Sequence, residues 1–120
     1  MATTDPVTGQ QIVQIGAASA AAGSSGIIPT VSSATVNAGV ASAATSVTIV
    51  AANAARRGLL LVNTDANILR IKYGATATAS SFTVPIPSGG YWEMPQPIYL
   101  GIIDGIWDAD GSGSAFVTEL

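Results

Sequence analysis

Hydrophobic and polar positions divide the chain at about residue 44. Beyond that point, short apolar stretches are separated by turn residues, and several alternate between apolar and polar positions as half-buried strands do. No segment shows a helical period. The pattern predicts an all-β domain over residues 44–120, either a small antiparallel β-sandwich or a barrel. The predicted strands lie at residues 46–50, 59–62, 68–73, 82–84, 91–94, 98–107 and 115–120.

Two of these stretches predict which side chains face the core. Alternation over residues 68–73 places three apolar residues on one face and Arg70 and Lys72 on the other, a solvated face that discourages edge pairing. Residues 59–62 instead form an unbroken apolar run, which suits a strand covered on both faces. We therefore expect a second layer over that strand, from the same chain or from a partner. Residues 85–90, Pro-Ile-Pro-Ser-Gly-Gly, predict a turn.

Residues 1–43 are rich in Ala, Ser, Thr and Gly, with no aromatic residue and a single charged side chain, Asp5. Interspersed glycine and serine reduce the helix propensity of the alanines. Such a segment buries too little surface to fold alone. We predict an extended N-terminal arm held by neighbouring subunits, and the alternative is that it adds edge strands to its own domain. The candidate contacts are its scattered apolar residues, Ile12, Val13, Ile15, Ile27 and Ile28.

Composition argues against several classes of function. With 4 Lys+Arg against 7 Asp+Glu and a net charge of −3, the chain lacks the basic cluster of a nucleic-acid-binding surface. No stretch reaches the roughly 18 apolar residues of a membrane span, and no basic residue precedes the Ala-rich stretch as in a secretory signal. Cysteine and histidine are absent, which removes disulfides, thiolate ligands and the commonest catalytic bases. We expect a soluble protein without enzymatic activity and without a cofactor.

One motif indicates a metal site. Residues 108–119, DADGSGSAFVTE, match the EF-hand calcium loop. Its side-chain oxygen donors would be Asp108, Asp110, Ser112 and Glu119. An EF-hand also needs a helix on each side of its loop, but one residue follows the motif and glycines with strand-forming residues precede it. We predict a hairpin turn instead. The alternative is a calcium site outside an EF-hand that uses Asp104, Asp108 and Asp110.

Aromatic residues provide a second candidate site. Tyr91 and Trp92 adjoin a proline-rich segment, and Trp107 could lie near them. A cluster of exposed Trp and Tyr suits contact with a sugar or with another protein, whereas in a small domain the same residues also serve as core. Tyr91 and Trp92 are therefore candidate interface residues, with burial in the core as the alternative.

Several short pieces of sequence follow one another in a distinctive order. They are RGLLLVNTD at 57–65, LRIKYG at 69–74, FTVPI at 82–86, PSGGYWEMP at 87–95, GIW at 105–107 and AFVTE at 115–119. In this order they resemble small virion proteins of tailed bacteriophages. The resemblance covers roughly residues 55–119 and does not reach the arm. It implies a compact β module that binds other virion subunits, often as a trimer.

The resemblance and the small size of the domain lead to a functional prediction. A β domain of about 75 residues is marginal alone, and without disulfides or a metal its remaining stabiliser is association. We predict a bacteriophage capsid decoration (cement) protein, made in the host cytoplasm and located on the capsid surface of the virion. Its partners would be the major capsid protein and neighbouring copies of itself, as a homotrimer. The alternative is a fibre, tail-attachment or glycan-binding receptor module of the virion.

Overall fold

The structure, a computed structural model, describes residues 30–120, which form nine β-strands and no helix. This part of the chain accordingly contains no helix that is long and apolar enough to cross a membrane. The strands are β1 (Thr35–Val36), β2 (Val40–Ala41), β3 (Val47–Val50), β4 (Leu59–Asn63), β5 (Leu69–Tyr73), β6 (Val84–Ile86), β7 (Tyr91–Glu93), β8 (Ile103–Trp107) and β9 (Ser114–Glu119). The all-β prediction is confirmed.

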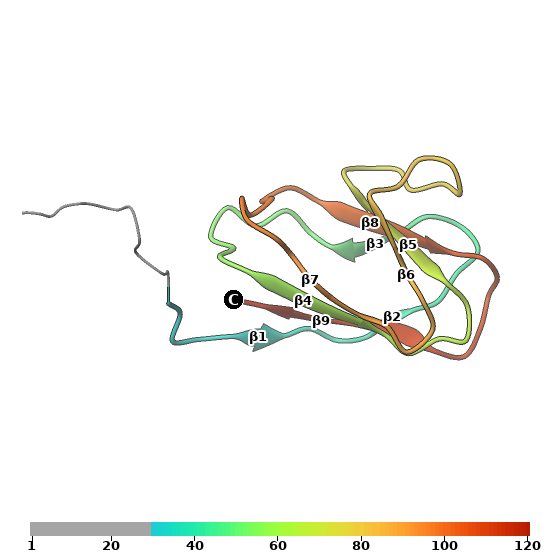
Figure 1. The fold of residues 1–120 in the computed structure, drawn as a ribbon, viewed down its shortest axis with the longest axis horizontal. Coiled ribbons are helices and arrows are strands. Elements are labelled where there is room, and N and C mark those ends of the chain that lie inside the picture. The colour runs from blue at the N-terminus through green and yellow to red at the C-terminus, as the bar shows by residue number, and fades with distance from the viewer. Residues whose placement is uncertain (1–29) are drawn as a thin grey trace, which may run out of the picture. The chain divides into compact units, whose positions relative to one another are not determined.

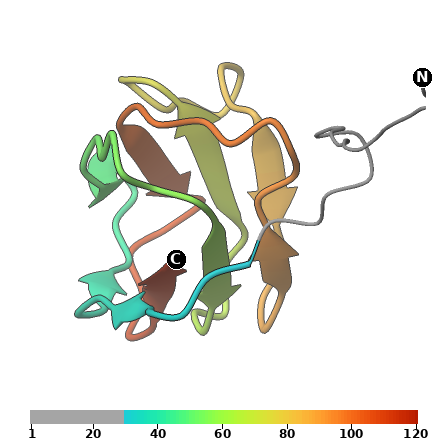
Figure 2. The same ribbon diagram turned by 90° about the vertical axis from the view of Figure 1, so that its left-hand side faces the viewer.

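The strands form two antiparallel sheets that pack face to face as a β-sandwich (Figures 1 and 2). One sheet, called here the β4 sheet, has the order β1-β9-β4-β7, with β2 pairing further along β9. The other, the β5 sheet, has the order β3-β8-β5-β6. Neighbouring strands come from distant parts of the sequence. In the β4 sheet, for example, the last strand, β9, pairs with β1, β2 and β4.

The core lies between the sheets and follows the alternation of each strand. In β4, Leu59 and Leu61 are buried, while Leu60 and Val62, which alternate with them, are not. In β5, Leu69 and Ile71 are buried in the same alternating way, whereas β8 buries all of its residues except Ile106. Each large apolar side chain removed from water stabilises the fold by about 1.5–3 kcal/mol. The most completely buried apolar side chains are Leu59, Leu61, Leu69, Ile71, Ile86, Ile103, Trp107 and Val117.

The strands differ from the predicted ones in two places. Residues 85–90 were predicted as a turn, but Pro85 and Ile86 belong to β6, which begins at Val84. Proline is tolerated there because β6 is an edge strand, so the missing N–H of the exposed Pro85 costs no pairing with another strand. Of the stretch 98–107, only Ile103–Trp107 forms a strand.

The expected boundary between arm and domain, at residues 43 and 44, also differs from the structure. β1 and β2 lie before that boundary and both pair with β9, so the last part of the predicted arm adds edge strands to the sandwich. The residue pattern gives little sign of these two strands. Most residues of the segment are small and exposed, although the backbone of β1 and β2 is paired. The rest of the predicted arm, residues 1–29, lies outside the described residues.

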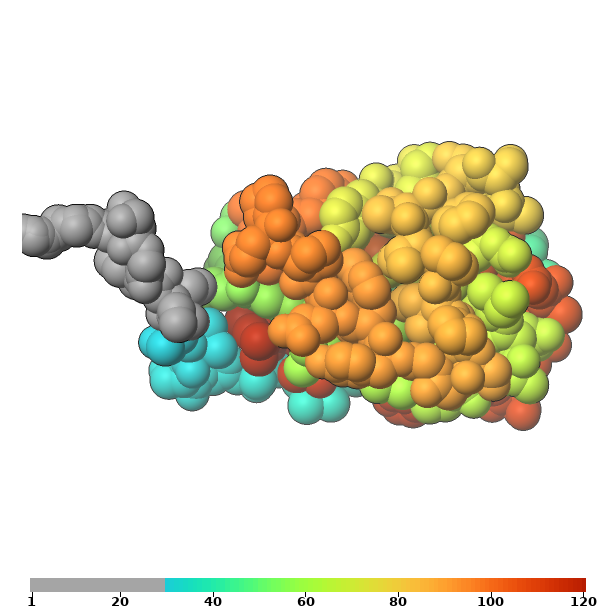
Figure 3. Space-filling view, in the orientation of Figure 1, coloured from blue at the N-terminus to red at the C-terminus, as the bar shows by residue number. Residues whose placement is uncertain are grey.

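Aromatic residues close one side of the sandwich. Tyr73 stacks on Tyr99 with ring centroids 4.5 Å apart and meets Trp92 edge-on at 6.2 Å. Such aromatic pairs stabilise by about 0.5–1.5 kcal/mol beyond the area they bury. Figure 3 shows this side from outside, where the loop before β6, strands β6 and β7, and the segment after β7 (yellow to orange) cover the molecule. Burial raises the pKa of the Tyr73 hydroxyl.

Candidate interaction surface

Strand register places apolar side chains together on the outer face of the β4 sheet. Residues directly opposite each other on neighbouring strands point to the same face. One row across the sheet consists of Val36, Thr118, Leu60 and Glu93. The next row consists of Phe116, Val62 and Tyr91. We call the surface formed by these seven residues the outer face.

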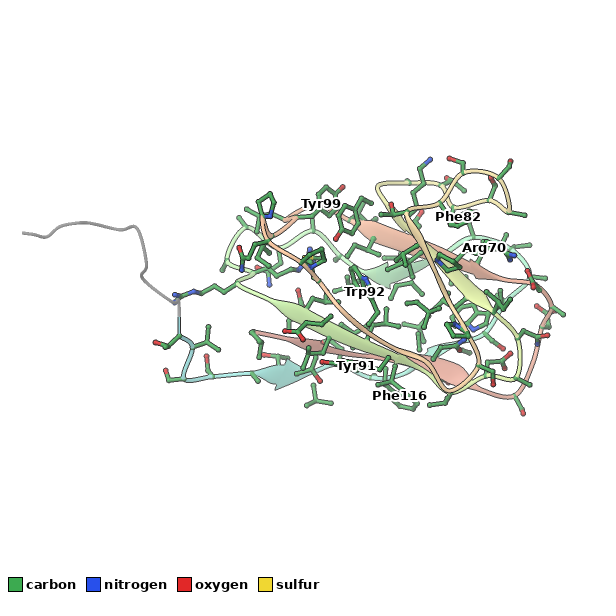
Figure 4. All side chains as sticks on the ribbon, in the orientation of Figure 1. Arg70, Phe82, Tyr91, Trp92, Tyr99 and Phe116 are labelled. Carbon is green, nitrogen blue, oxygen red and sulfur yellow. The ribbon has the colours of Figure 1, made fainter. Side chains whose placement is uncertain are left out.

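The outer face leaves large apolar side chains in contact with solvent. Relative exposure is 75% for Val36, 61% for Tyr91, 45% for Phe116 and 37% for Val62. Figure 4 shows Tyr91 and Phe116 on this side of the β4 sheet, whereas Trp92 points toward the β5 sheet. Single exposed apolar residues are ordinary, but contiguous apolar patches on soluble proteins usually mark interaction sites. The outer face is therefore the candidate functional site.

Only one charged side chain lies on the outer face. The carboxylate of Glu93 accepts a hydrogen bond of 3.3 Å from the Tyr91 hydroxyl. Partial burial of the Tyr91 ring, together with the neighbouring Glu93 carboxylate, raises the pKa of that hydroxyl. The face thus carries apolar area with one acidic group at its β7 edge, and a partner needs little charge to match it.

A glycine helps to shape the face. Gly39 lies between β1 and β2, and a Cβ atom placed on it would be 2.8 Å from Cε1 of Phe116. That distance is shorter than a normal contact between carbon atoms. The absence of a side chain at Gly39 lets the Phe116 ring lie against the backbone of the edge segment. The ring is held on one side and presents its other side to solvent.

The outer face of the β5 sheet is more polar. Arg70 forms an ion pair with Asp108, and its guanidinium lies 5.4 Å from the centroid of the Phe82 ring (Figure 4). The ammonium of Lys72 donates to the carbonyl of Thr76. Charged and polar partners thus occupy this face. Within residues 30–120 the two surfaces of the sandwich differ in chemistry, and the outer surface of the β4 sheet is the more apolar.

A buried ion pair fastens the end of β9 to the loop before β4. Nε of Arg56 lies 2.9 Å from Oε2 of Glu119, and the Arg56 side chain is fully buried. Its remaining N–H groups donate to three backbone carbonyls, those of Ala51, Tyr99 and Gly101. The amides of Asn53 and Asn37 donate to the same carboxylate, and Asn37 directly follows β1. This cluster, the Arg56 clasp, ties the edge strand β1 to the rest of the sandwich.

The electrostatics of the Arg56 clasp favour a charged carboxylate. Burial raises the pKa of Glu119, but the hydrogen bonds from Arg56, Asn53 and Asn37 outweigh it, so the pKa of Glu119 is lowered overall. Every polar atom of the Arg56 guanidinium has an acceptor. The cluster is internally satisfied, so we assign it a structural role.

The candidate calcium ligands of the EF-hand motif, which formed the alternative to a turn, are not brought together. Asp108 pairs with Arg70, Asp110 accepts a hydrogen bond of 2.7 Å from the backbone N–H of Ala44, and Glu119 belongs to the Arg56 clasp. β9 begins directly after Gly113 and extends to Glu119, which separates the two ends of the motif by roughly 20 Å. Ser112 lies in the exposed turn before β9. Within residues 30–120 no cluster of three or more acidic residues is arranged to hold a metal ion.

The alternative calcium site, on Asp104, Asp108 and Asp110, also lacks the required geometry. Asp104 lies within β8 and is buried, with Ser46 Oγ 3.5 Å from its Oδ2. Asp108 follows Asp104 by four positions along an extended strand, which corresponds to about 13 Å. The predicted hairpin is wrong in its pairing. Residues 108–113 turn the chain between β8, which ends at Trp107, and β9, which starts at Ser114, but the two strands belong to different sheets and do not pair.

Asp65, rather than the EF-hand aspartates, organises the turn before β9. Its carboxylate accepts hydrogen bonds from the backbone N–H groups of Asn67 and Gly113, at 2.9 and 2.8 Å. These bonds lower the pKa of Asp65, the bond from Asn67 first, against the opposing effect of burial. The glycines of the motif allow this close packing, because a Cβ atom on Gly111 or Gly113 would collide with Asp65. The first part of the motif therefore forms a turn that packs on the buried carboxylate of Asp65.

The predicted interface residues fall into three groups. Tyr91 lies on the outer face and is exposed. Trp92 faces inward and packs half-buried against the core. Five others are outside the described residues, namely Ile12, Val13, Ile15, Ile27 and Ile28. Trp107 is buried and donates a hydrogen bond of 3.1 Å to Oδ1 of Asn63, so the three aromatic residues form no common exposed cluster.

Sequence reasoning missed most of the outer face. Its members Val36, Leu60, Val62 and Phe116 come from three strands, and only the register brings them together. The available clue was the unbroken apolar run at 59–62, which demanded a covering layer on both sides of β4. Within residues 30–120 the chain supplies that layer on the inner side only. Comparison with protein-family models, curated proteins and solved structures finds no match to this chain.

Proposed function

We propose that this chain is a capsid decoration (cement) protein of a tailed bacteriophage, which binds the assembled head and stabilises it. The observation that carries the proposal is the outer face, an exposed apolar surface on one sheet of a small sandwich. The resemblance of residues 55–119 to small phage virion proteins supplies the type of partner. In this proposal the sandwich sits on the capsid exterior as a homotrimer, and residues 1–29 contact the major capsid protein.

Mass action explains how such a protein stabilises a shell. A ligand that binds the assembled lattice but not its separated subunits adds to the free energy of disassembly, by about 2.7 kcal/mol per site at a free concentration 100 times its dissociation constant. A long arm of small residues suits this task, because it contributes contact area and raises the effective concentration of the domain it tethers. Neither element requires a catalytic group.

A glycan-binding receptor module receives less support. That function calls for exposed aromatic rings gathered on one surface. Of Tyr91, Trp92 and Trp107, only Tyr91 is well exposed, and its neighbours on the outer face are aliphatic residues and Phe116. A surface of this kind fits an apolar protein partner better than the polar groups of a sugar.

The test of the proposed function uses heads of the phage whose genome encodes the chain, prepared without this protein. Purified full-length protein is added, the heads are pelleted, and the temperature of DNA release is followed with a DNA-binding dye. We expect the protein to pellet with the heads at a saturating stoichiometry and to raise the release temperature by several degrees. Protein that stays in the supernatant at all concentrations would contradict the proposal.

A further inference from the structure

The chain enters β1 from beyond the end of the β4 sheet. β1 is antiparallel to β9, and the pairing of Thr35 with Glu119 places Ala34 opposite Leu120, the end of the chain. Residues 31–34 are all exposed and belong to no strand. Figure 1 shows them extending past the C-terminal end of β9, and Figure 4 shows Tyr91 and Phe116 well away from them. Residues 31–34 therefore lie beyond the end of the β4 sheet and not over its outer face.

The sequence just before this entry point is chemically matched to the outer face. Ile27 and Ile28 form an apolar pair between Gly26 and Pro29, and residues 6–29 contain no charged side chain. The outer face offers exposed valine, leucine and aromatic side chains and one carboxylate. Burying two isoleucine side chains against apolar surface is favourable, and no unpaired charge from this segment is buried with them.

The length and direction of the chain before β1 bear on which outer face Ile27 and Ile28 can reach. Seven residues lead from Ile28 to Thr35, a span of at most about 23 Å when extended. Four strands of the β4 sheet are about 14 Å wide. Reaching its own outer face would require the chain to reverse direction beyond the end of β9, whereas the outer face of a second copy placed beyond that end would require no reversal.

We propose that Ile27 and Ile28 of one copy dock on the outer face of a second copy, against Val62 and its neighbours Phe116 and Tyr91. The contact is heterologous, because an arm segment meets a sheet face, and repeated contacts of this kind close into a ring when the rotation between copies permits. A three-membered ring is the homotrimer expected from the sequence. The inference rests on the part of the proposed function in which copies of the chain associate.

Cysteine cross-linking tests this contact, because the natural chain has no cysteine. Two full-length variants, Ile28→Cys and Val62→Cys, are purified separately, one with a mass tag, then mixed and treated with a short bis-maleimide. We expect a cross-linked heterodimer joined between positions 28 and 62, identified by mass spectrometry. Val36→Cys, at another exposed position of the outer face, provides a second acceptor. No capsid is present, so failure here leaves shell binding untouched.

The control acceptor is Leu100→Cys, which is 42% exposed and lies in the segment between β7 and β8, away from the outer face. We expect its yield with Ile28→Cys to be roughly tenfold lower, as for a pair brought together only by collision. Equal yields with positions 36, 62 and 100 would overturn the proposal. A chain carrying both Ile28→Cys and Val62→Cys that cross-links only within itself would also overturn it, by showing that the arm covers its own sheet.

Discussion

The Arg56 clasp is the most consequential single cluster in the described chain. A fully buried guanidinium is tolerated because it has one carboxylate and three carbonyls as acceptors. Breaking such a pair on one side leaves a buried charge without compensation, which commonly costs 3–5 kcal/mol. Because Asn37 also contacts Glu119, the same cluster holds β1 at the sheet edge.

The clasp predicts a pH-dependent stability. The lowered pKa of Glu119 in the folded state means that its contribution is present above its ordinary value, 4.5, and is lost as pH falls through the folded pKa. Glu119→Gln should therefore reduce the free energy of unfolding by about 3 kcal/mol at pH 7, and the difference from the natural protein should narrow toward pH 3. Urea unfolding at both pH values measures this.

Glu93→Gln is the matched control, since it removes one carboxylate from the exposed outer face instead of from the clasp. It should unfold at both pH values much as the natural protein does. A difference between Glu119→Gln and the natural protein that stays constant from pH 7 to pH 3 would mean that the carboxylate charge contributes nothing to the clasp.

At the scale of elements, one face of β4 belongs to the core and the other face belongs to the candidate surface. Leu61 is fully buried between the sheets, while Val62, one residue further on, faces outward. Leu61→Ala should lower the free energy of unfolding by about 2–5 kcal/mol, because it leaves a cavity in the core. Val62→Ala should cost about 1 kcal/mol or less in the separated subunit. Urea unfolding at low protein concentration measures both, and equal losses would contradict this orientation of β4.

The segment from Asp108 to Glu119 supports a second prediction at this scale. Its carboxylates already have protein partners, and an extended strand separates the last of them from the first two. We expect the same thermal unfolding midpoint in millimolar calcium and in excess chelator, measured by circular dichroism. A midpoint that rises with calcium by several degrees would restore the metal site on Asp108, Asp110, Ser112 and Glu119.

Elements were predictable from sequence where their pattern was local. Alternation over residues 68–73 and the apolar run at 59–62 located β5 and β4 to within one residue at either end. β1 and β2 correspond to the alternative in which the arm adds edge strands to its own domain. The sequence did not favour it, because their residues are mostly exposed and their pairing partner is β9 at the other end of the chain. β6 was obscured by Pro85, whose position on a sheet edge no local pattern reveals.

The candidate site was predictable only in part, because it depends on contacts distant in sequence. The unbroken apolar run indicated that β4 needs a cover, and Tyr91 was a candidate contact on account of its residue type. Register was needed to join Tyr91, Val62 and Phe116 into one surface. The Arg56 clasp had no local clue, since no acidic residue stands near Arg56 in the sequence and its partner Glu119 follows 63 residues later.

At the scale of the whole molecule, the account depends on whether the outer face is a surface through which copies associate. Sedimentation velocity of the full-length protein at micromolar concentration measures this directly. Val62→Asp places a charge at the centre of the face. Ile68→Asp is the matched control, because Ile68 has the same 37% exposure but lies just before β5, off that face.

We predict that the natural protein and Ile68→Asp sediment as trimers, whereas Val62→Asp sediments as a folded monomer with an unchanged circular dichroism spectrum. A roughly tenfold or larger increase in the dissociation constant corresponds to the loss of about 1.4 kcal/mol, which a buried charge readily causes. A natural protein that remains monomeric, or a Val62→Asp variant that remains trimeric, would contradict association through the outer face.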